Sequence, residues 1–188
     1  MATDEVAQDL TSELTRVINS VAIRRMDAAC LNVVNWSKTA PAGVSYAEHK
    51  LTFIDAFANA ENKLNAAAGR GNISRMIAGT NAAAVLRAMP GFTTVDSSLN
   101  QSVGLYGYLN GIPVIRASQI IDTDTILCAY KGGSYFEAPL VHAPYMPLFV
   151  SSTLSAGNNP LRNQRVAAVW SGLKVVIPSF LVRIKIVA

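Results

Sequence analysis

A long amphipathic helix is encoded by residues 4–34, which read DEVAQDLTSELTRVINSVAIRRMDAACLNVV. Apolar side chains recur at the spacing of one helix face, at Val6, Leu10, Leu14, Val17, Ile18 and Val21. No Gly or Pro interrupts the chain before Pro41, so the pattern predicts a helix from about Asp4 to Val34. At 1.5 Å per residue this helix would be about 45 Å long, which exceeds the width of a compact domain of this size. We therefore expect it to lie against a long surface.

Helices come first along the chain and strands come later. Further helices are predicted at residues 46–67 and 81–89, and strands at 73–78, 103–109, 112–116, 125–130, 166–171 and 174–187. The dipeptide Asn110-Gly111 predicts a tight hairpin turn, because both residues accept the positive φ values that such a turn requires. Residues 139–147 contain three prolines and are expected to form an extended loop rather than the interior of a sheet. The order of elements indicates the α+β class.

The helix at residues 46–67 is expected to end at Gly69, a usual left-handed terminator. The helical period predicts that one stripe of this helix is formed roughly by Leu51, Ile54, Phe57, Ala58, Glu61 and Leu64. His49 is expected on the exposed side. Residues 36–43, which include a proline and a glycine, predict a break between the two long helices.

The composition is poor in charge. Charged residues make up 15% and hydrophobic residues 51%, against about 25% charged in an ordinary soluble domain. Such a chain is either a membrane protein or a protein whose surface is partly covered by partners. A spanning helix needs about 20 consecutive apolar residues, but the most apolar tract, residues 166–188, is interrupted by Lys174, Pro178 and Arg183. No basic-then-apolar leader opens the sequence, so we expect a soluble intracellular chain or part of an assembled particle, with no membrane partner.

The net charge of +4 lies in the second half of the chain. Residues 1–100 contain 9 acidic and 9 basic side chains, whereas residues 101–188 contain 3 acidic and 7 basic side chains. These cations are scattered singly along strand-like segments. The pattern therefore does not favour a dedicated nucleic-acid-binding site.

Two short motifs could bind ions, and both have a simpler interpretation. Gly69-Arg70-Gly71-Asn72 leads from a helix into a strand, the reverse of the order in phosphate-binding loops, and so indicates a helix cap and a turn. Asp122 and Asp124 have no third carboxylate nearby in the sequence and indicate a turn rather than a cation site. We predict neither a metal nor a cofactor.

Cys30 and Cys128 are the only cysteines, and their wide separation predicts two buried thiols rather than a disulfide or a zinc site. A catalytic dyad of either thiol with His142 is the alternative. However, Cys128 lies in an apolar strand, which would raise its thiol pKa and make it inert. The sequence has no Gly-x-Ser-x-Gly nucleophile turn. We therefore predict no catalytic residue.

Three parts of the sequence resemble the major capsid proteins of tailed bacteriophages, particularly those with contractile tails. Gly69-Arg70-Gly71-Asn72-Ile73 is similar to the family's Arg-Gly-x-Gly-Asn stretch. Tyr130-Lys131-Gly132, Glu137-Ala138 and the run from Ala143 to Leu148 are similar to its Gly-Tyr-Lys-Gly, Asp-Ala-Gly and Ala-Pro-Tyr-x-Pro-Leu series. The opening helix resembles the family's spine helix. The candidate assembly or fold-motif positions are Arg70, Gly71, Asn72, Tyr130, Lys131, Gly132, Pro144, Tyr145 and Pro147.

The resemblance implies a long spine helix and an axial domain with a mixed sheet flanked by helices. Family members carry further segments before the spine helix, so this chain is expected to be a C-terminal portion with the peripheral part largely missing. The implied divisions are the spine helix and a peripheral remnant in residues 1–40, the axial domain in 41–165, and strands returning to the sheet in 166–188.

The implied function is that of a structural, non-enzymatic subunit of an icosahedral shell around a viral genome. Its partners would be other copies in pentamers and hexamers, with non-specific contact to packaged DNA on the inner face and no small-molecule substrate. Its location would be the virion, assembled in the host cytoplasm. The alternatives are the shell of an encapsulin-like compartment and, in a different class, a small ligand-binding or hydrolytic domain centred on His142.

Overall fold

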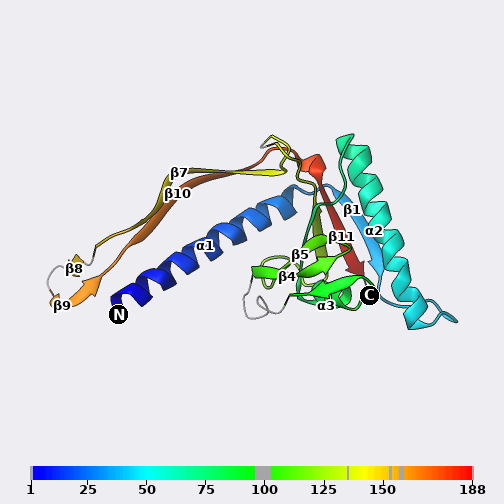
Figure 1. Ribbon diagram of the computed structural model, residues 1–188, viewed down its shortest axis with the longest axis horizontal. Coiled ribbons are helices and arrows are strands. Elements are labelled where there is room, and N and C mark those ends of the chain that lie inside the picture. Colours follow the sequence, from blue (N-terminus) through cyan, green and yellow to red (C-terminus); the bar gives the residue numbers. More distant parts are fainter. Residues whose placement is uncertain (1, 96–102, 135, 153, 157–158, 188) are drawn as a thin grey trace.

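The protein has a body built on one seven-stranded sheet and an arm that projects from it (Figure 1). The structure, a computed structural model, describes residues 2–95, 103–134, 136–152, 154–156 and 159–187. Within these ranges, the side chains of residues 2–4, 103, 147–148, 154–156 and 159–164 are not described. The helices are α1 (Ala2–Ala29), α2 (Tyr46–Ala68), α3 (Thr80–Arg87) and the short 3-10 helix η2 (Pro178–Phe180). The strands are β1 (Asn32–Ser37), β2 (Arg75–Ala78), β3 (Phe92–Thr94), β4 (Val103–Leu109), β5 (Ile112–Ala117), β6 (Thr125–Ala129), β7 (Leu140–Val150), β8 (Leu154–Ala156), β9 (Asn159–Gln164), β10 (Ala167–Val175) and β11 (Leu181–Val187).

The body sheet is mixed and has the order β1-β11-β6-β2-β5-β4-β3. β1 runs parallel to β11 and β2 parallel to β5, whereas the other neighbours are antiparallel. α2 and α3 pack on one face, around a core that includes Phe53, Leu64 and Leu86. The last turns of α1 pack on the other face through Ile23, against Leu127 and other buried residues. Helices followed by a mixed sheet confirm the predicted α+β class.

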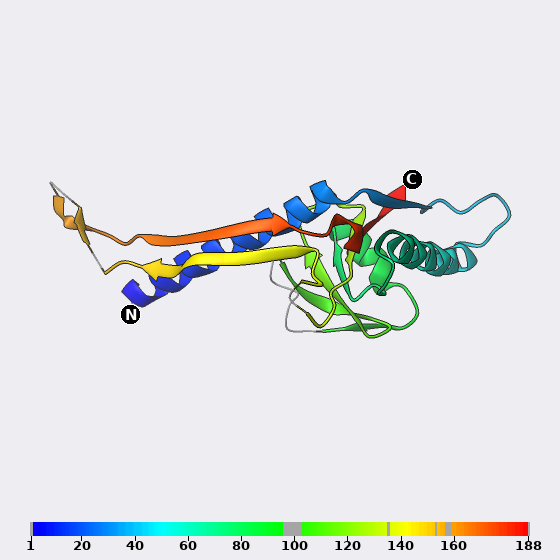
Figure 2. The ribbon, with the colours of Figure 1, turned by 90° about the horizontal axis from the view of Figure 1, so that it is seen from above.

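The arm consists of α1 and a two-stranded ribbon, β7 and β10, that runs along it (Figures 1 and 2). α1 has 28 residues, which corresponds to about 42 Å. The guanidinium of Arg25 in α1 donates a hydrogen bond to the carbonyl oxygen of Leu173 in β10. The expected long surface beside the first helix is thus provided by this ribbon.

α1 ends earlier than the sequence pattern predicts. The helix stops at Ala29 and the next residues form β1, so the predicted helix to Val34 and the break beginning at Trp36 were wrong. Val34 and Trp36 are buried while the residues between and before them are exposed, as in a strand with one covered face. The cause is tertiary, because β1 pairs along its whole length with β11 at the other end of the chain.

The second helix matches its predicted span. Ser45 and Glu48 form a capping box at its start, and Gly69 ends it with a φ of 70°. Its buried face differs from the predicted stripe and consists of His49, Phe53, Ala56, Ala60 and Leu64. Leu51 and Ile54 are 51% and 52% exposed, respectively.

His49 is buried, contrary to the sequence prediction. Its ring stacks on Trp36 with the centroids 5.5 Å apart, and its Nε2 lies 2.8 Å from the carbonyl oxygen of Ser37. The face that contacts the sheet carries Ala56 and Ala60, which allow the helix to approach closely. The predicted stripe shares only Leu64 with this buried face, so the spacing of side chains alone did not identify the face that contacts the sheet.

The predicted hairpin is confirmed by β4 and β5, which pair across the turn Asn110-Gly111. The φ values of these two residues are 49° and 83°, as a tight hairpin turn requires. β2, α3 and β6 also lie within a few residues of their predicted positions.

The proline-containing stretch of residues 139–147 forms most of β7, so the predicted loop was wrong. β7 pairs with β10 in a ribbon of only two strands, which leaves each strand with a free edge. A strand with a free edge tolerates proline, which has no N–H group to donate. Pro144 lies opposite Ser171, next to an irregularity in the register between Trp170 and Ser171.

The burial pattern of α2 predicts opposite outcomes for two leucines. Leu64→Ala removes a side chain that is 0% exposed and should lower the free energy of unfolding by about 3 kcal/mol. Leu51→Ala, on the exposed face, should change it by less than about 0.5 kcal/mol. Urea unfolding followed by circular dichroism measures both values. A larger loss for Leu51→Ala would mean that the predicted stripe, rather than the observed face, contacts the sheet.

Candidate functional site

Two of the motifs singled out in the sequence meet in space, together with Phe180 of η2. The Arg70 guanidinium pairs with the Glu137 carboxylate at 2.9 Å. The same guanidinium lies over the Phe180 ring, 5.9 Å from its centroid. We call this group, with Gly71, Tyr130 and Gly132, the motif junction.

Tyr130 lies at the centre of the motif junction. Its ring meets Phe180 edge to face, with the centroids 5.1 Å apart, and its N–H donates to the Phe180 carbonyl oxygen at 3.0 Å. Gly71 has a φ of +89°, and a Cβ atom there would lie 2.6 Å from the Tyr130 ring. Only glycine fits at position 71, for both its backbone conformation and its contact.

Backbone hydrogen bonds hold the loop after Tyr130 in place. The Lys131 N–H donates to the Ser74 Oγ at 2.8 Å, and the Gly132 N–H donates to the Glu137 carbonyl oxygen at 2.9 Å. A side chain on Gly132 would collide with that of Glu137. Asn72 is exposed and accepts a hydrogen bond from Asn65 at 3.4 Å. These contacts fix a turn, and they do not hold a reactive group.

The remaining candidate positions lie on the ribbon of the arm and are not part of the motif junction. Pro144 and Tyr145 are on β7, and Tyr145 is 85% exposed. Pro147 also belongs to β7, but its side chain lies outside the described residues. The sequence motifs therefore divide into a structural junction in the body and exposed positions on the arm.

The arm exposes a series of large apolar side chains. On the ribbon these are Tyr145, Phe149, Val166 and Trp170, of which Trp170 is 65% exposed. A groove of about 560 Å³ runs between the ribbon and α1, and its lining includes Tyr145, Trp170 and Val17. The predicted apolar stripe of α1 is only partly covered, since Val6 and Val17 are each 52% exposed. Exposed apolar patches of this kind are common where proteins contact one another.

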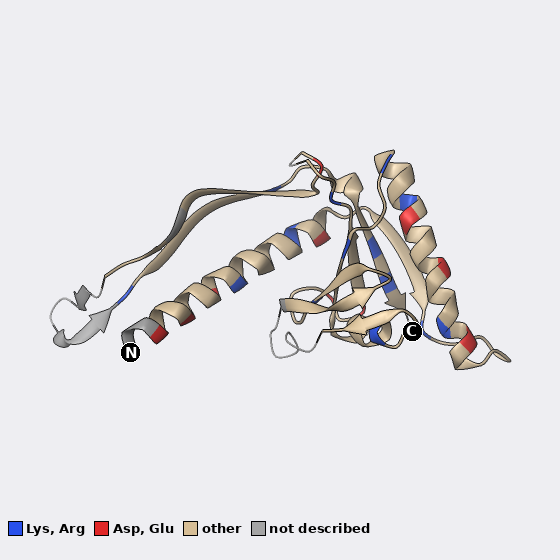
Figure 3. Ribbon diagram, viewed as in Figure 1, with Lys and Arg blue, Asp and Glu red and all other residues tan. Residues whose placement is uncertain are grey.

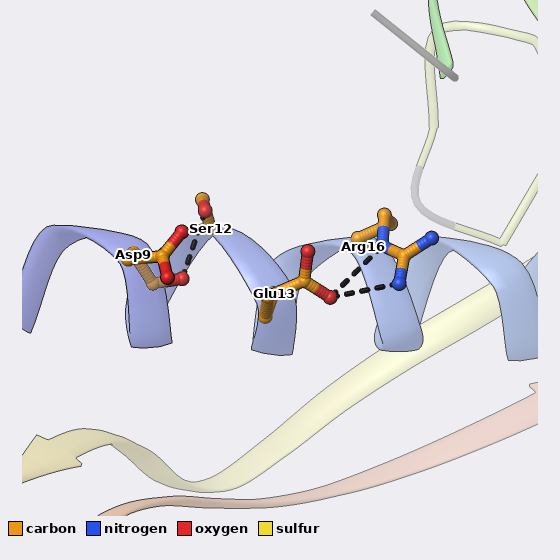
Figure 4. A network of polar contacts seen from close by, with 4 residues as sticks. All are labelled: Asp9, Ser12, Glu13 and Arg16. Carbon is orange, nitrogen blue, oxygen red and sulfur yellow. Dashed lines mark hydrogen bonds and ion pairs between the residues drawn. The ribbon is translucent and has the colours of Figure 1, made fainter. Parts of the chain in front are cut away.

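Two pairs of polar residues in the outer half of α1 interact within the helix itself. The Ser12 hydroxyl donates to the Asp9 carbonyl oxygen, and the Glu13 carboxylate pairs with the Arg16 guanidinium at 2.8 Å (Figure 4). Both ionic side chains are more than half exposed, so the pair contributes little to stability.

A dyad of Cys128 with His142 is not formed. The Cys128 side chain is in the core between the sheet and α2, whereas His142 lines a groove of about 310 Å³ on the other face of the sheet. Burial raises the pKa of the Cys128 thiol, and burial likewise raises that of Cys30. The Cys30 thiol donates to the Asn32 carbonyl oxygen at 3.4 Å. The predicted buried thiols are confirmed.

The walls of the groove beside His142 are mainly apolar, with Arg75 and Lys131 also among its lining residues.

Asp124 accepts hydrogen bonds from Asn81 and Thr123. Among the described residues, no group of three or more His, Cys, Asp or Glu side chains could hold a metal ion. Nor does the described part of the chain contain a helix long and apolar enough to cross a membrane.

The sequence interpretation missed two contributors. No role was predicted from the sequence for Phe180, although this residue contacts both Arg70 and Tyr130. Trp170 lies on the arm beside the groove, but a lone tryptophan in an apolar tract carries no sign of its exposure. Neither could be found from spacing alone, because both depend on contacts between distant parts of the chain.

Comparison with known proteins matches the family described as "Major capsid protein Gp23" to residues 1–166. The chain belongs to this major capsid protein family. The resemblance stated from the sequence is thereby confirmed, and the family is one of structural capsid proteins. A search of curated proteins finds no match.

Two solved structures share the fold. A chain from Mycobacterium phage Che8 is 18% identical with a TM-score of 0.61, covering 95% of this chain and 61% of that chain. A virus-like particle from Pyrococcus furiosus is 12% identical with a TM-score of 0.52, covering 92% of this chain and 64% of that chain. The chain thus spans somewhat over three fifths of the length of these two structures. At these identities the likeness concerns the fold alone, and it confirms the predicted capsid fold.

The motif junction predicts that Gly71→Ala is strongly destabilising. The variant combines a positive φ with a clash against Tyr130 and should lower the free energy of unfolding by about 3 kcal/mol. Gly43→Ala is the matched control, because its φ is +87° but nothing lies within 4 Å of the added Cβ. It should lose only about 1 kcal/mol. Equal losses in urea unfolding would show that Tyr130 does not restrict position 71.

The buried thiols predict slow alkylation of the native protein. Only the thiolate reacts, and the raised thiol pKa values keep both cysteines protonated at neutral pH. Iodoacetamide should therefore modify neither residue until denaturant is added, as followed by mass spectrometry. The Cys30→Ser variant isolates Cys128. Rapid labelling of that variant in native buffer would contradict the burial of Cys128.

Proposed function

We propose that this chain is a structural subunit that assembles with other copies of itself into the shell of a tailed phage. The observation that carries the proposal is the match to the major capsid protein family over residues 1–166. Its location would be the virion, after assembly in the host cytoplasm. The enclosed genome would touch one face of the shell without sequence preference.

The shape of the molecule supports assembly. An arm about 42 Å long leaves the body with large apolar side chains exposed along its ribbon. A monomer would leave this surface in water, whereas neighbouring copies would cover it. Head-to-tail contacts of one surface with a different one generate closed rings, such as the pentamers and hexamers of a shell.

The candidate positions take two roles in this proposal. Arg70, Gly71, Tyr130 and Gly132 would set the fold through the motif junction, with Asn72 and Lys131 in the same loops. Pro144, Tyr145 and Pro147 would lie at contacts between copies. For the subunit as a whole we propose the spine helix with a peripheral remnant in residues 1–40, the axial domain in 41–165 and the C-terminal strands in 166–188. In these divisions β1 enters the sheet of the axial domain, and the ribbon of β7 and β10 leaves that sheet along the spine helix.

A shell subunit needs no reactive group, so we propose that the chain is not an enzyme and takes no cofactor. The alternative of a hydrolytic domain around His142 is weakened by the mainly apolar groove beside that residue and by the position of Cys128 across the sheet. The encapsulin-like alternative is not favoured, because the matching family is that of a phage capsid protein.

The proposal predicts association through the arm. At rising concentration the purified chain should form oligomers or particles, observed by light scattering and negative-stain microscopy. The double variant Trp170→Ser with Tyr145→Ser should remain smaller, because it removes two exposed apolar contacts. Trp170→Phe with Tyr145→Phe is the matched control and should associate like the original chain.

Circular dichroism of all three proteins verifies that the body is folded. A chain that stays monomeric at high concentration would contradict shell formation. Unchanged association of the serine variant would show that the arm patch is not a contact between copies.

A further inference from the structure

The sheet gathers cations that look scattered in the sequence. Arg183 and Lys185 of β11 and Arg75 of β2 point to the face of the sheet on which α1 packs, because they alternate with residues buried under α2. Lys131 lines the same groove as Arg75, together with Met26 of α1. We call this face, with its four cations, the α1 side of the sheet.

Carboxylates are scarce on the α1 side. Asp27 of α1 is half-buried there, and it is already paired with Arg183 at 2.8 Å. Arg75, Lys131 and Lys185 are exposed, and within the described part of the chain no carboxylate lies at ion-pair distance from any of them. Figure 3 shows the contrast with the outer half of α1, where acidic residues gather. The opposite side of the body carries charges of both signs, since α2 contains Glu48, Lys50, Asp55, Glu61 and Lys63.

The spacing of the three unpaired cations suits an extended polyanion. Arg75 lies opposite Ala129 of β6, and Lys185 lies opposite Thr125 on the other side of the same strand. Their backbone positions are therefore separated by about 13 Å along the strands and about 10 Å across them. A compact anion would not reach both, whereas duplex DNA carries one charge per about 1.7 Å of its axis.

We infer that the α1 side of the sheet is a polyanion-binding surface whose occupant is duplex DNA, held by Arg75, Lys131 and Lys185. This rests on the proposed function in one respect, since a shell around a genome supplies duplex DNA as the polyanion. The three cations lie singly on a sheet face that α1 partly covers, so they belong to no element that could enter a groove of the duplex as a helix does. Its contacts are with phosphates and are independent of sequence.

The test is binding of a fluorescent duplex of about 30 base pairs, measured by anisotropy at several salt concentrations. The test variant is Arg75→Gln with Lys131→Gln and Lys185→Gln. The control is Lys38→Gln with Lys50→Gln and Arg87→Gln, which removes the same charge from residues outside the α1 side. The original chain should bind with an affinity that falls steeply as salt rises.

The test variant should lose at least about tenfold in affinity at about 50 mM salt, and its log–log salt slope should fall by about 2 to 3, close to 0.9 per phosphate contact. The control should lose less than about twofold. No binding by the original chain, or equal losses in the two variants, would overturn the inference. It is also overturned if polyglutamate competes as well as unlabelled duplex at equal charge, because the occupant would then be an acidic protein segment.

Light scattering without DNA separates this inference from the proposed function. The test variant should still associate like the original chain, because the exposed apolar residues of the arm are unchanged. DNA binding that depends on the three cations, in a chain that never associates, would overturn shell formation and leave the binding surface standing. Normal association together with equal DNA binding by both variants would overturn the binding surface and leave shell formation standing.

Discussion

The parallel pairing of β1 with β11 is the constraint on which the rest of the structure depends. β1 follows α1 after two residues, and β11 follows β10 through the short helix η2. The two main pieces of the arm therefore enter the sheet as neighbouring strands. Two further contacts fix the root of the arm, which is the place where α1 and β10 join the sheet. They are the ion pair of Arg183 with Asp27 and the hydrogen bond from Asn32 to the Leu181 carbonyl oxygen. Because α1 and β10 start side by side, they can run out from the body side by side.

This constraint also explains which sequence predictions succeeded. The spans of α2 and of the β4–β5 hairpin were predictable, because Ser45, Gly69 and Asn110-Gly111 act through local backbone geometry. The end of α1 was not, because no Gly or Pro marks it in the sequence and residues 32–34 form a strand through pairing with β11. The prolines of β7 similarly indicated a loop, since a two-stranded ribbon with free edges leaves no mark in the sequence. Local signals determined the bounds of α2 and of the β4–β5 hairpin, whereas long-range pairing determined the end of α1 and the strand conformation of residues 140–147.

The candidate positions show the same division. The glycines of the motif junction could be recognised as turn residues, but the reason that position 71 excludes a side chain is the Tyr130 ring. That ring is held in turn by Phe180, at the point where β10 passes into β11. The junction thus ties the loop after β6 and the loop after α2 to the root of the arm. Residues that resemble a functional motif here determine geometry rather than chemistry.

Apolar and basic surfaces occupy different parts of the molecule, and this separation has a physical use. Apolar contact is non-directional and depends little on salt, which suits permanent contacts between copies. Phosphate contacts weaken steeply with salt and carry no sequence preference, which would suit the proposed contact with any stretch of a genome. The described ribbon of the arm contains few charges, whereas three cations without an ion pair lie on the α1 side of the sheet. In the proposed shell, this arrangement would let a subunit hold its neighbours firmly while its contact with the enclosed polymer stays weak enough to let that polymer move.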